Sequence, residues 1–203
     1  MAKHNGNEAA RARTMVAQEA ARIIVNQGIR DYRLAKTKAA ERLGFGARGT
    51  LPGNAEIERA VGEYLQLFSG DAHRDLLLAL RRAALSAMRL LECFSPRLVG
   101  PVLAGTADAN AAVNLHVFAD SPETVSFHIA DAGLTPRLYE RRLKSRRGRN
   151  ETYSGYQFRY SHTSIEATVF PFDGLRQAPI SPIDGRPMRR ADDKAVRALI
   201  QSA

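Results

Sequence analysis

The sequence predicts an α+β fold, in which a helical first half is followed by a small mixed β-sheet flanked by helices. Apolar residues recur at helical spacing up to about residue 94, the pattern changes at Pro96, and short β-rich runs follow. The chain has 203 residues, of which 44% are hydrophobic, so it can bury a substantial core. We expect a helical region over 1–70 and an α+β domain with an extended C-terminal arm over 71–203.

Four helices are expected in the first half. They cover residues 8–27, 29–43, 54–70 and 72–94. Asn54 is a favourable N-cap for the third, with Glu56 and Glu58 in its first turn, and Gly70 ends it. The fourth helix is the most apolar and should lie deep in the core.

The second half alternates strands with helices and turns. The expected strands cover 97–104, 113–118, 156–160 and 164–170. A helix should begin at Ser121-Pro122 and run to about Gly133. Residues 171–190 are rich in Pro and Gly and predict an extended arm, which a short helix over 191–201 follows.

The net charge of +9 is concentrated in one segment. Between residues 137 and 149, Glu140 is the single acidic residue among seven basic ones, which are Arg137, Arg141, Arg142, Lys144, Arg146, Arg147 and Arg149. Such a cluster attracts the phosphates of nucleotides or nucleic acid, because it neutralises their charge and releases counterions. The alternative is a solvated loop that keeps a basic protein soluble.

Other classes of protein are not favoured. No apolar run approaches the length of a membrane span, so we expect no membrane contact. The N-terminal residues lack the apolar core of a secretory signal, and Cys93, the single cysteine, cannot form an internal disulfide. These features predict a cytoplasmic protein.

A possible site lies around the second expected strand. The Gly105-Thr106 turn precedes that strand, Asn114 and His116 alternate along it, and Glu166 stands on a later strand. The order of a long helix, a strand, this turn, a strand, a helix and a further strand resembles the nucleotidyltransferase superfamily, which includes polymerase-β-like enzymes and MNT-type proteins. The resemblance covers about residues 76–170.

The resemblance implies specific roles. In that family the glycine turn holds nucleotide phosphates through backbone amides, and Gly105 and Thr106 match this turn. A strand then presents two carboxylates, and a later strand a third, which together bind two divalent metals for phosphoryl transfer. Asn114 and His116 stand where the paired carboxylates should be, and Glu166 takes the place of the third. The expected cofactor, if the site is catalytic, is Mg²⁺ held by Glu166.

The departure from the family pattern leaves several interpretations open. Asn and neutral His suit Mg²⁺ poorly. The site has either lost catalysis while keeping a nucleotide or RNA pocket, or His116 acts as an acid or base in another reaction. Alternatively, His116 is a strand residue satisfied by a neighbour and Glu166 is an exposed strand carboxylate.

Three functions follow as hypotheses. The first is a nucleotidyltransferase-like protein that transfers a nucleotidyl group from a nucleoside triphosphate or binds nucleotide without turnover. The second is a non-catalytic module that binds nucleic acid through Arg137–Arg149. The third is a protein-interaction role in which the N-terminal helices contact a partner.

Overall fold

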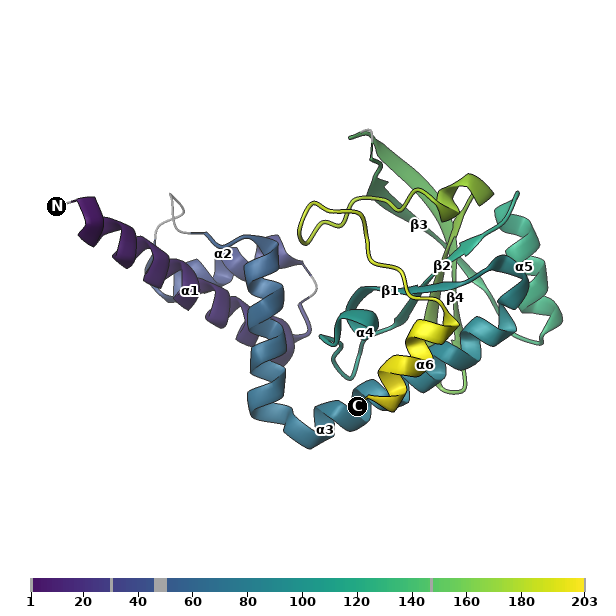
Figure 1. The fold of residues 1–203 in the computed structure, drawn as a ribbon, viewed down its shortest axis with the longest axis horizontal. Helices are drawn as coiled ribbons and strands as arrows, with labels where there is room; N and C mark the ends of the chain where they lie inside the picture. The colour runs from purple at the N-terminus through teal and green to yellow at the C-terminus, as the bar shows by residue number, and fades with distance from the viewer. Residues whose placement is uncertain (1, 30, 46–50, 147, 203) are drawn as a thin grey trace. The chain divides into compact units, whose positions relative to one another are not determined.

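The computed structural model describes residues 2–29, 31–45, 51–146 and 148–202, and within them the fold is α+β, as predicted (Figure 1). Six α-helices and a five-stranded mixed sheet are present in these ranges. The chain divides into two compact units, the first comprising 1–73 and 182–184, the second 74–181 and 185–203. The boundary expected at residue 70 lies close to this division.

The first unit is helical. It contains α1 (Ala2–Gln27), α2 (Tyr32–Arg42) and the first part of α3 (Asn54–Leu90). The predicted break at Gly70 is a kink inside α3, where φ is 32° and ψ is −112°. The buried core of this unit is aliphatic and consists of Val16, Ala17, Ala20, Ala21, Ile23, Ala35, Ala39, Ala40, Ile57, Ala60, Val61 and Leu65.

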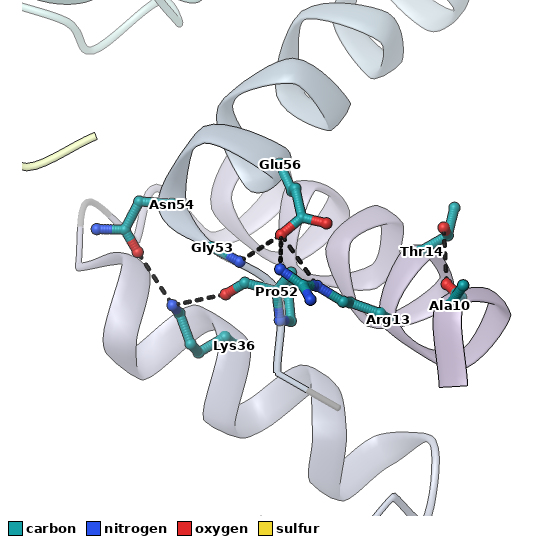
Figure 2. Close-up of polar contacts among 8 residues, drawn as sticks. All are labelled: Ala10, Arg13, Thr14, Lys36, Pro52, Gly53, Asn54 and Glu56. Atoms are coloured by element: carbon teal, nitrogen blue, oxygen red, sulfur yellow. Dashed lines mark hydrogen bonds and ion pairs between the residues drawn. The ribbon is translucent and has the colours of Figure 1, made fainter. Parts of the chain in front are cut away.

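Polar contacts connect the start of α3 to the other two helices (Figure 2). The Glu56 carboxylate accepts from Arg13 Nη2 at 2.7 Å and from the Gly53 amide at 2.7 Å, and both contacts lower the pKa of Glu56. Asn54 is the first residue of the helix rather than its cap, and its Oδ1 accepts from Lys36 Nζ at 3.0 Å. The capping function expected of Asn54 therefore falls to Glu56, which holds the exposed amide of Gly53.

The second unit contains the sheet. Its strands are β1 (Arg97–Val99), β2 (Val113–Phe118), β3 (Arg137–Lys144), β4 (Asn150–Tyr160) and β5 (Thr163–Phe170), in the order β1-β2-β5-β4-β3. β2 and β5 are parallel, and the other pairs are antiparallel. The remaining elements are α4 (Gly100–Ala104), α5 (Pro122–Asp131), α6 (Asp193–Gln201) and the 3-10 turns η1 (Glu92–Phe94) and η2 (Phe172–Leu175).

Two expectations about the strands were wrong. The strand expected over 97–104 ends at Val99, because Gly100 has a φ of +72° and Pro101 begins the short helix α4. Most of the basic segment is not a loop, since residues 137–144 form the edge strand β3, which pairs with a β4 that begins six residues earlier than predicted.

The two faces of the sheet differ in chemistry because side chains alternate along each strand. One face carries Val113, Leu115 and Val117 on β2 and Ile165, Ala167 and Val169 on β5. These residues belong to one buried cluster with apolar residues of α3, α5 and α6. We call this the helix-covered face and the opposite one the polar face.

The C-terminal arm expected over 171–190 runs to residue 192 and is extended between turns, which include η2 and residues 182–184. The Leu98 and Ala191 backbones exchange two hydrogen bonds, of 2.8 and 2.9 Å, at the β1 edge of the sheet. The Ile180 amide donates to the Lys144 carbonyl at 2.7 Å at the β3 edge. The arm is thus attached to both edges of the sheet.

Candidate functional site

The polar face brings together three of the residues singled out in the sequence. Asn114 and His116 alternate on β2, and Glu166 lies on the neighbouring β5 directly beside Asn114 in the parallel register. Residues in register on adjacent strands lie about 5 Å apart. The alternation that suggested these residues therefore places them on one face.

Arg141 of β3 contacts two of these residues. Its Nη2 lies 2.5 Å from Glu166 Oε2, and its Nη1 donates to Asn114 Oδ1 at 3.2 Å. The guanidinium also lies over the Tyr139 ring, 5.4 Å from its centroid. Glu166 is therefore an ion-paired, half-buried carboxylate, and the expectation of an exposed strand carboxylate was wrong.

Tyr139 and Gly155 form a tight arrangement beside this ion pair. The Tyr139 hydroxyl lies 2.8 Å from Thr168 Oγ1, which is fully buried on β5. To reach it, the ring crosses β4 above Gly155, where an added Cβ would lie 2.4 Å from Tyr139 Cζ. Burial also raises the pKa of Tyr139. Glycine is required at position 155 because the ring fills the space of a side chain.

His116 lies beneath an arginine of the C-terminal arm. It is 1% exposed and its ring contacts that of Phe170, with centroids 4.4 Å apart. Arg190 Nε donates to His116 Nδ1 at 3.0 Å, and Arg190 Nη1 donates to the Gly174 carbonyl at 2.6 Å. The Arg190 guanidinium lies 5.0 Å from the ring centroids of both Phe118 and Phe170.

These contacts determine the protonation state of His116. Burial, together with the charges of Arg190 and Arg141, lowers the pKa of His116 well below its ordinary value. The ring is therefore neutral at pH 7, and since Nδ1 accepts a hydrogen bond, Nε2 carries the proton. This arrangement agrees with a buried strand histidine, bonded to a neighbour through Nδ1 only, and not with an acid or base exposed to a substrate.

The Gly105-Thr106 turn is placed differently. It ends the five-residue helix α4, whose first residue, Gly100, lies against the Asn114 side chain. The amides of Gly105 and Thr106 donate to the Pro101 carbonyl at 2.8 and 3.0 Å, and a Cβ at Gly105 would approach Arg81 of α3. The amides that the resemblance assigns to nucleotide phosphates are thus already bonded within the protein.

The residue set does not fit a magnesium site. Each of the three residues that the resemblance assigns to the metal site accepts a hydrogen bond from a guanidinium group. Asn114 and Glu166 accept from Arg141, and His116 accepts from Arg190. Mg²⁺ requires oxygen ligands free to enter an octahedral shell. Across the described ranges, no three His, Cys, Asp or Glu side chains lie close enough to hold a metal ion.

The basic segment is largely exposed. Its exposed cations, which make no ion pair within the described residues, are Arg137, Arg142, Lys144, Arg146 and Arg149. Arg141 is the member that turns inward to Glu166. The predicted residue Arg147 lies outside the described residues.

Sequence reasoning missed three residues of the polar face. Tyr139 was not singled out because residues 137–149 were interpreted only as a basic segment. Arg97 was not singled out because residues 97–104 were interpreted as one apolar strand. Arg190 lies in an arm whose Pro and Gly content indicates only extended structure. The alternation of Arg97 with Leu98, and of Arg190 with Ala191, was a usable signal, because the apolar member of each pair lies in the helix-covered cluster.

Comparisons of the chain with protein-family models, with curated proteins and with solved structures found no match. In the part of the chain that the structure describes, every helix is too short or too polar to span a membrane. The function must therefore be inferred from the geometry of the chain itself.

Proposed function

We propose that this protein is a nucleotidyltransferase-like domain that binds nucleic acid without turnover, through a basic hairpin formed by residues 137–149. The observation that carries the proposal is a group of five exposed cations on and beyond the edge strand β3, which make no ion pair within the described residues. Phosphate groups are the ligands that such a group attracts, since each contact releases condensed counterions.

The strand geometry supports binding of an extended polyanion. Arg142 and Lys144 point to the same side of β3 and are separated by about 7 Å along it. Arg146 and Arg149 extend the positive charge into the β3–β4 connection. Glu140 is the single acidic residue of the segment, so the charge between 137 and 149 is seven positive minus one negative, or +6.

Nucleotidyl transfer is the less favoured function, because the groups that would hold a divalent cation are bonded to Arg141 and Arg190. The N-terminal helices offer a third possibility, since Leu67 and Phe68 are 78% and 71% exposed. Neither side chain indicates a particular partner, so a protein-interaction role rests on less evidence than the hairpin.

The test compares two triple variants. Arg142→Gln/Lys144→Gln/Arg149→Gln removes three hairpin charges, and Arg176→Gln/Arg189→Gln/Lys194→Gln removes three exposed charges elsewhere in the second unit. Fluorescence anisotropy with a single-stranded RNA is measured over a range of salt concentrations. The hairpin variant should reduce the slope of log K against log salt by about 2, while the control should leave it nearly unchanged.

Two outcomes would contradict the proposal. Equal losses in both variants would indicate non-specific attraction to a basic protein. Transfer of label from a nucleoside triphosphate in the presence of Mg²⁺, abolished by Glu166→Gln, would establish an enzyme instead.

A further inference from the structure

The polar face holds more positive charge than its own residues neutralise. Arg97, Arg141 and Arg190 all belong to it: the Arg97 Cα pairs with that of His116 across β1 and β2, and Arg190 bonds to His116. The Glu166 carboxylate neutralises Arg141 by forming an ion pair with it. Among the described residues, no carboxylate lies within ion-pair distance of Arg97 or Arg190.

The excess of positive charge affects the pKa of Arg190. Burial and the neighbouring charge of Arg97 lower the pKa of Arg190 to about 10. A partly buried cation next to a second cation is costly unless an anion compensates both. Arg97 Nη1 donates to two local carbonyls, those of Ser95 and Pro96, and the Arg97 charge also lacks an acidic partner in the described chain.

Two buried N–H groups lack acceptors. Arg190 Nη2 and His116 Nε2 are both buried and have no hydrogen-bond partner among the described residues. Leaving such donors unsatisfied destabilises the folded protein, because each loses its hydrogen bonds to water and gains none in return. His116 itself is 1% exposed, and its Nε2 carries the proton because Nδ1 accepts from Arg190. Unsatisfied donors beside unpaired cations indicate that an anionic acceptor belongs here.

We propose that the polar face binds a phosphate group directly through Arg97 and Arg190, without a divalent cation. Guanidinium groups already hold the polar acceptors of this face: Arg141 bridges Asn114 and Glu166, and Arg190 binds His116. Arginine suits direct phosphate binding because its charge is permanent, and Arg190 Nη2 is left without an acceptor among the described residues.

The inference rests on the proposed function in one respect: the phosphate is expected to belong to a nucleotide or to the end of a nucleic-acid strand. The way the fold positions Arg190 does not depend on that function. Ala191 exchanges backbone hydrogen bonds with Leu98 and packs in the helix-covered cluster, so the adjacent Arg190 projects to the opposite face beside Arg97.

The experiment measures binding of ATP by isothermal titration calorimetry in excess EDTA. Wild-type protein should bind, and addition of Mg²⁺ should not be needed. Arg190→Gln and Arg97→Gln should each weaken binding about ten-fold or more, since each removes a charge-assisted contact. Arg189→Gln, which removes the adjacent exposed charge, is the matched control and should bind normally.

Anisotropy with a 5′-phosphorylated and a 5′-hydroxyl form of the same RNA distinguishes the source of the phosphate. A preference for the phosphorylated strand that Arg97→Gln abolishes assigns the strand end. ATP binding without such a preference assigns a free nucleotide. If Arg190→Gln perturbs the circular dichroism spectrum, Arg97→Gln carries the test, since the Arg97 guanidinium bonds to the nearby Ser95 and Pro96 carbonyls.

The proposal is overturned if neither ATP nor the 5′-phosphate is recognised, if recognition requires Mg²⁺, or if Arg189→Gln weakens binding as much as Arg97→Gln. Failure here is separable from failure of the proposed function. RNA affinity that still depends on the Arg142, Lys144 and Arg149 charges would leave the hairpin proposal intact.

Discussion

The two faces of the sheet are built from the same strands but are stabilised in different ways. The helix-covered face buries hydrocarbon, with Leu115 and Ala167 fully inaccessible. The polar face uses a small number of directed contacts, such as the Tyr139–Thr168 hydrogen bond and the Arg141–Glu166 ion pair. The comparison shows that the helix-covered face is held by burial of hydrocarbon, whereas the polar face combines buried aromatic rings with directed hydrogen bonds and an ion pair.

The largest effect should come from breaking the helix-covered face. Leu115→Ala should lower the free energy of unfolding by about 3 kcal/mol, because it leaves a cavity in packed hydrocarbon. Asn114→Ala, one residue away on the polar face, should cost less, since its side chain is only partly buried. Urea denaturation of both variants checks this order, and equal losses would remove the distinction between the faces.

A second substitution tests packing on the polar face itself. Gly155→Ala should cost about 2 kcal/mol, because the new methyl group would overlap the Tyr139 ring and approach the Ala167 carbonyl at 2.8 Å. Thr152→Ala, at an exposed position of the same strand, serves as the control. A stable Gly155→Ala protein in thermal unfolding would mean that the ring does not lie across β4.

A smaller effect isolates one hydrogen bond. Tyr139→Phe should cost about 1 kcal/mol, because the buried Thr168 hydroxyl loses its partner. Adding Thr168→Val should restore much of the loss, since both polar groups are then absent. A double-mutant cycle measured by denaturation gives the coupling, and a coupling of zero would contradict the contact.

The smallest effect is a dependence on pH. The pKa of His116 is lowered in the folded protein, so the unfolded state binds the extra proton. Its contribution to stability should therefore be complete above about pH 6.5 and decrease as the pH falls below that value. His116→Gln should remove this part of the pH dependence, whereas His162→Gln, at an exposed turn, should not.

Nitrogen-15 NMR provides a direct reading of the same histidine. Its Nδ1 should show the shift of an acceptor and its Nε2 that of a protonated nitrogen at pH 7, because Arg190 donates to Nδ1. A charged His116 ring at that pH would show that Arg190 does not lie where the structure places it.

Local patterns predicted much of the fold. Alternation identified β2 and β5, and Pro122 after Ser121 identified the start of α5. The strand β3 escaped prediction because its inward positions include Arg141, whose partners Asn114 and Glu166 lie on other strands. A charged residue in a sequence is expected to face solvent unless its ion-pair partner is known. That partner is brought close only by the tertiary fold.

The candidate site was predictable only in part for the same reason. Sequence reasoning found Asn114 and His116 because they lie two residues apart on one expected strand. It found Glu166 because a later expected strand carries it. Arg190 was not, since it contacts His116 across 74 positions of sequence. No periodicity in residues 171–190 connects the arm to β2, and only the backbone pairing of Leu98 with Ala191 does so.

The space above Gly155, which the Tyr139 ring occupies, also has an evolutionary consequence. Because the Tyr139 ring fills it, positions 139 and 155 cannot change independently. Homologous chains with a larger residue in place of Gly155 should carry a small or flexible one in place of Tyr139, and they should have lost the hydroxyl of Thr168 more often than chance. Covariation of this kind would trace the lineage in which the polar face acquired its present form.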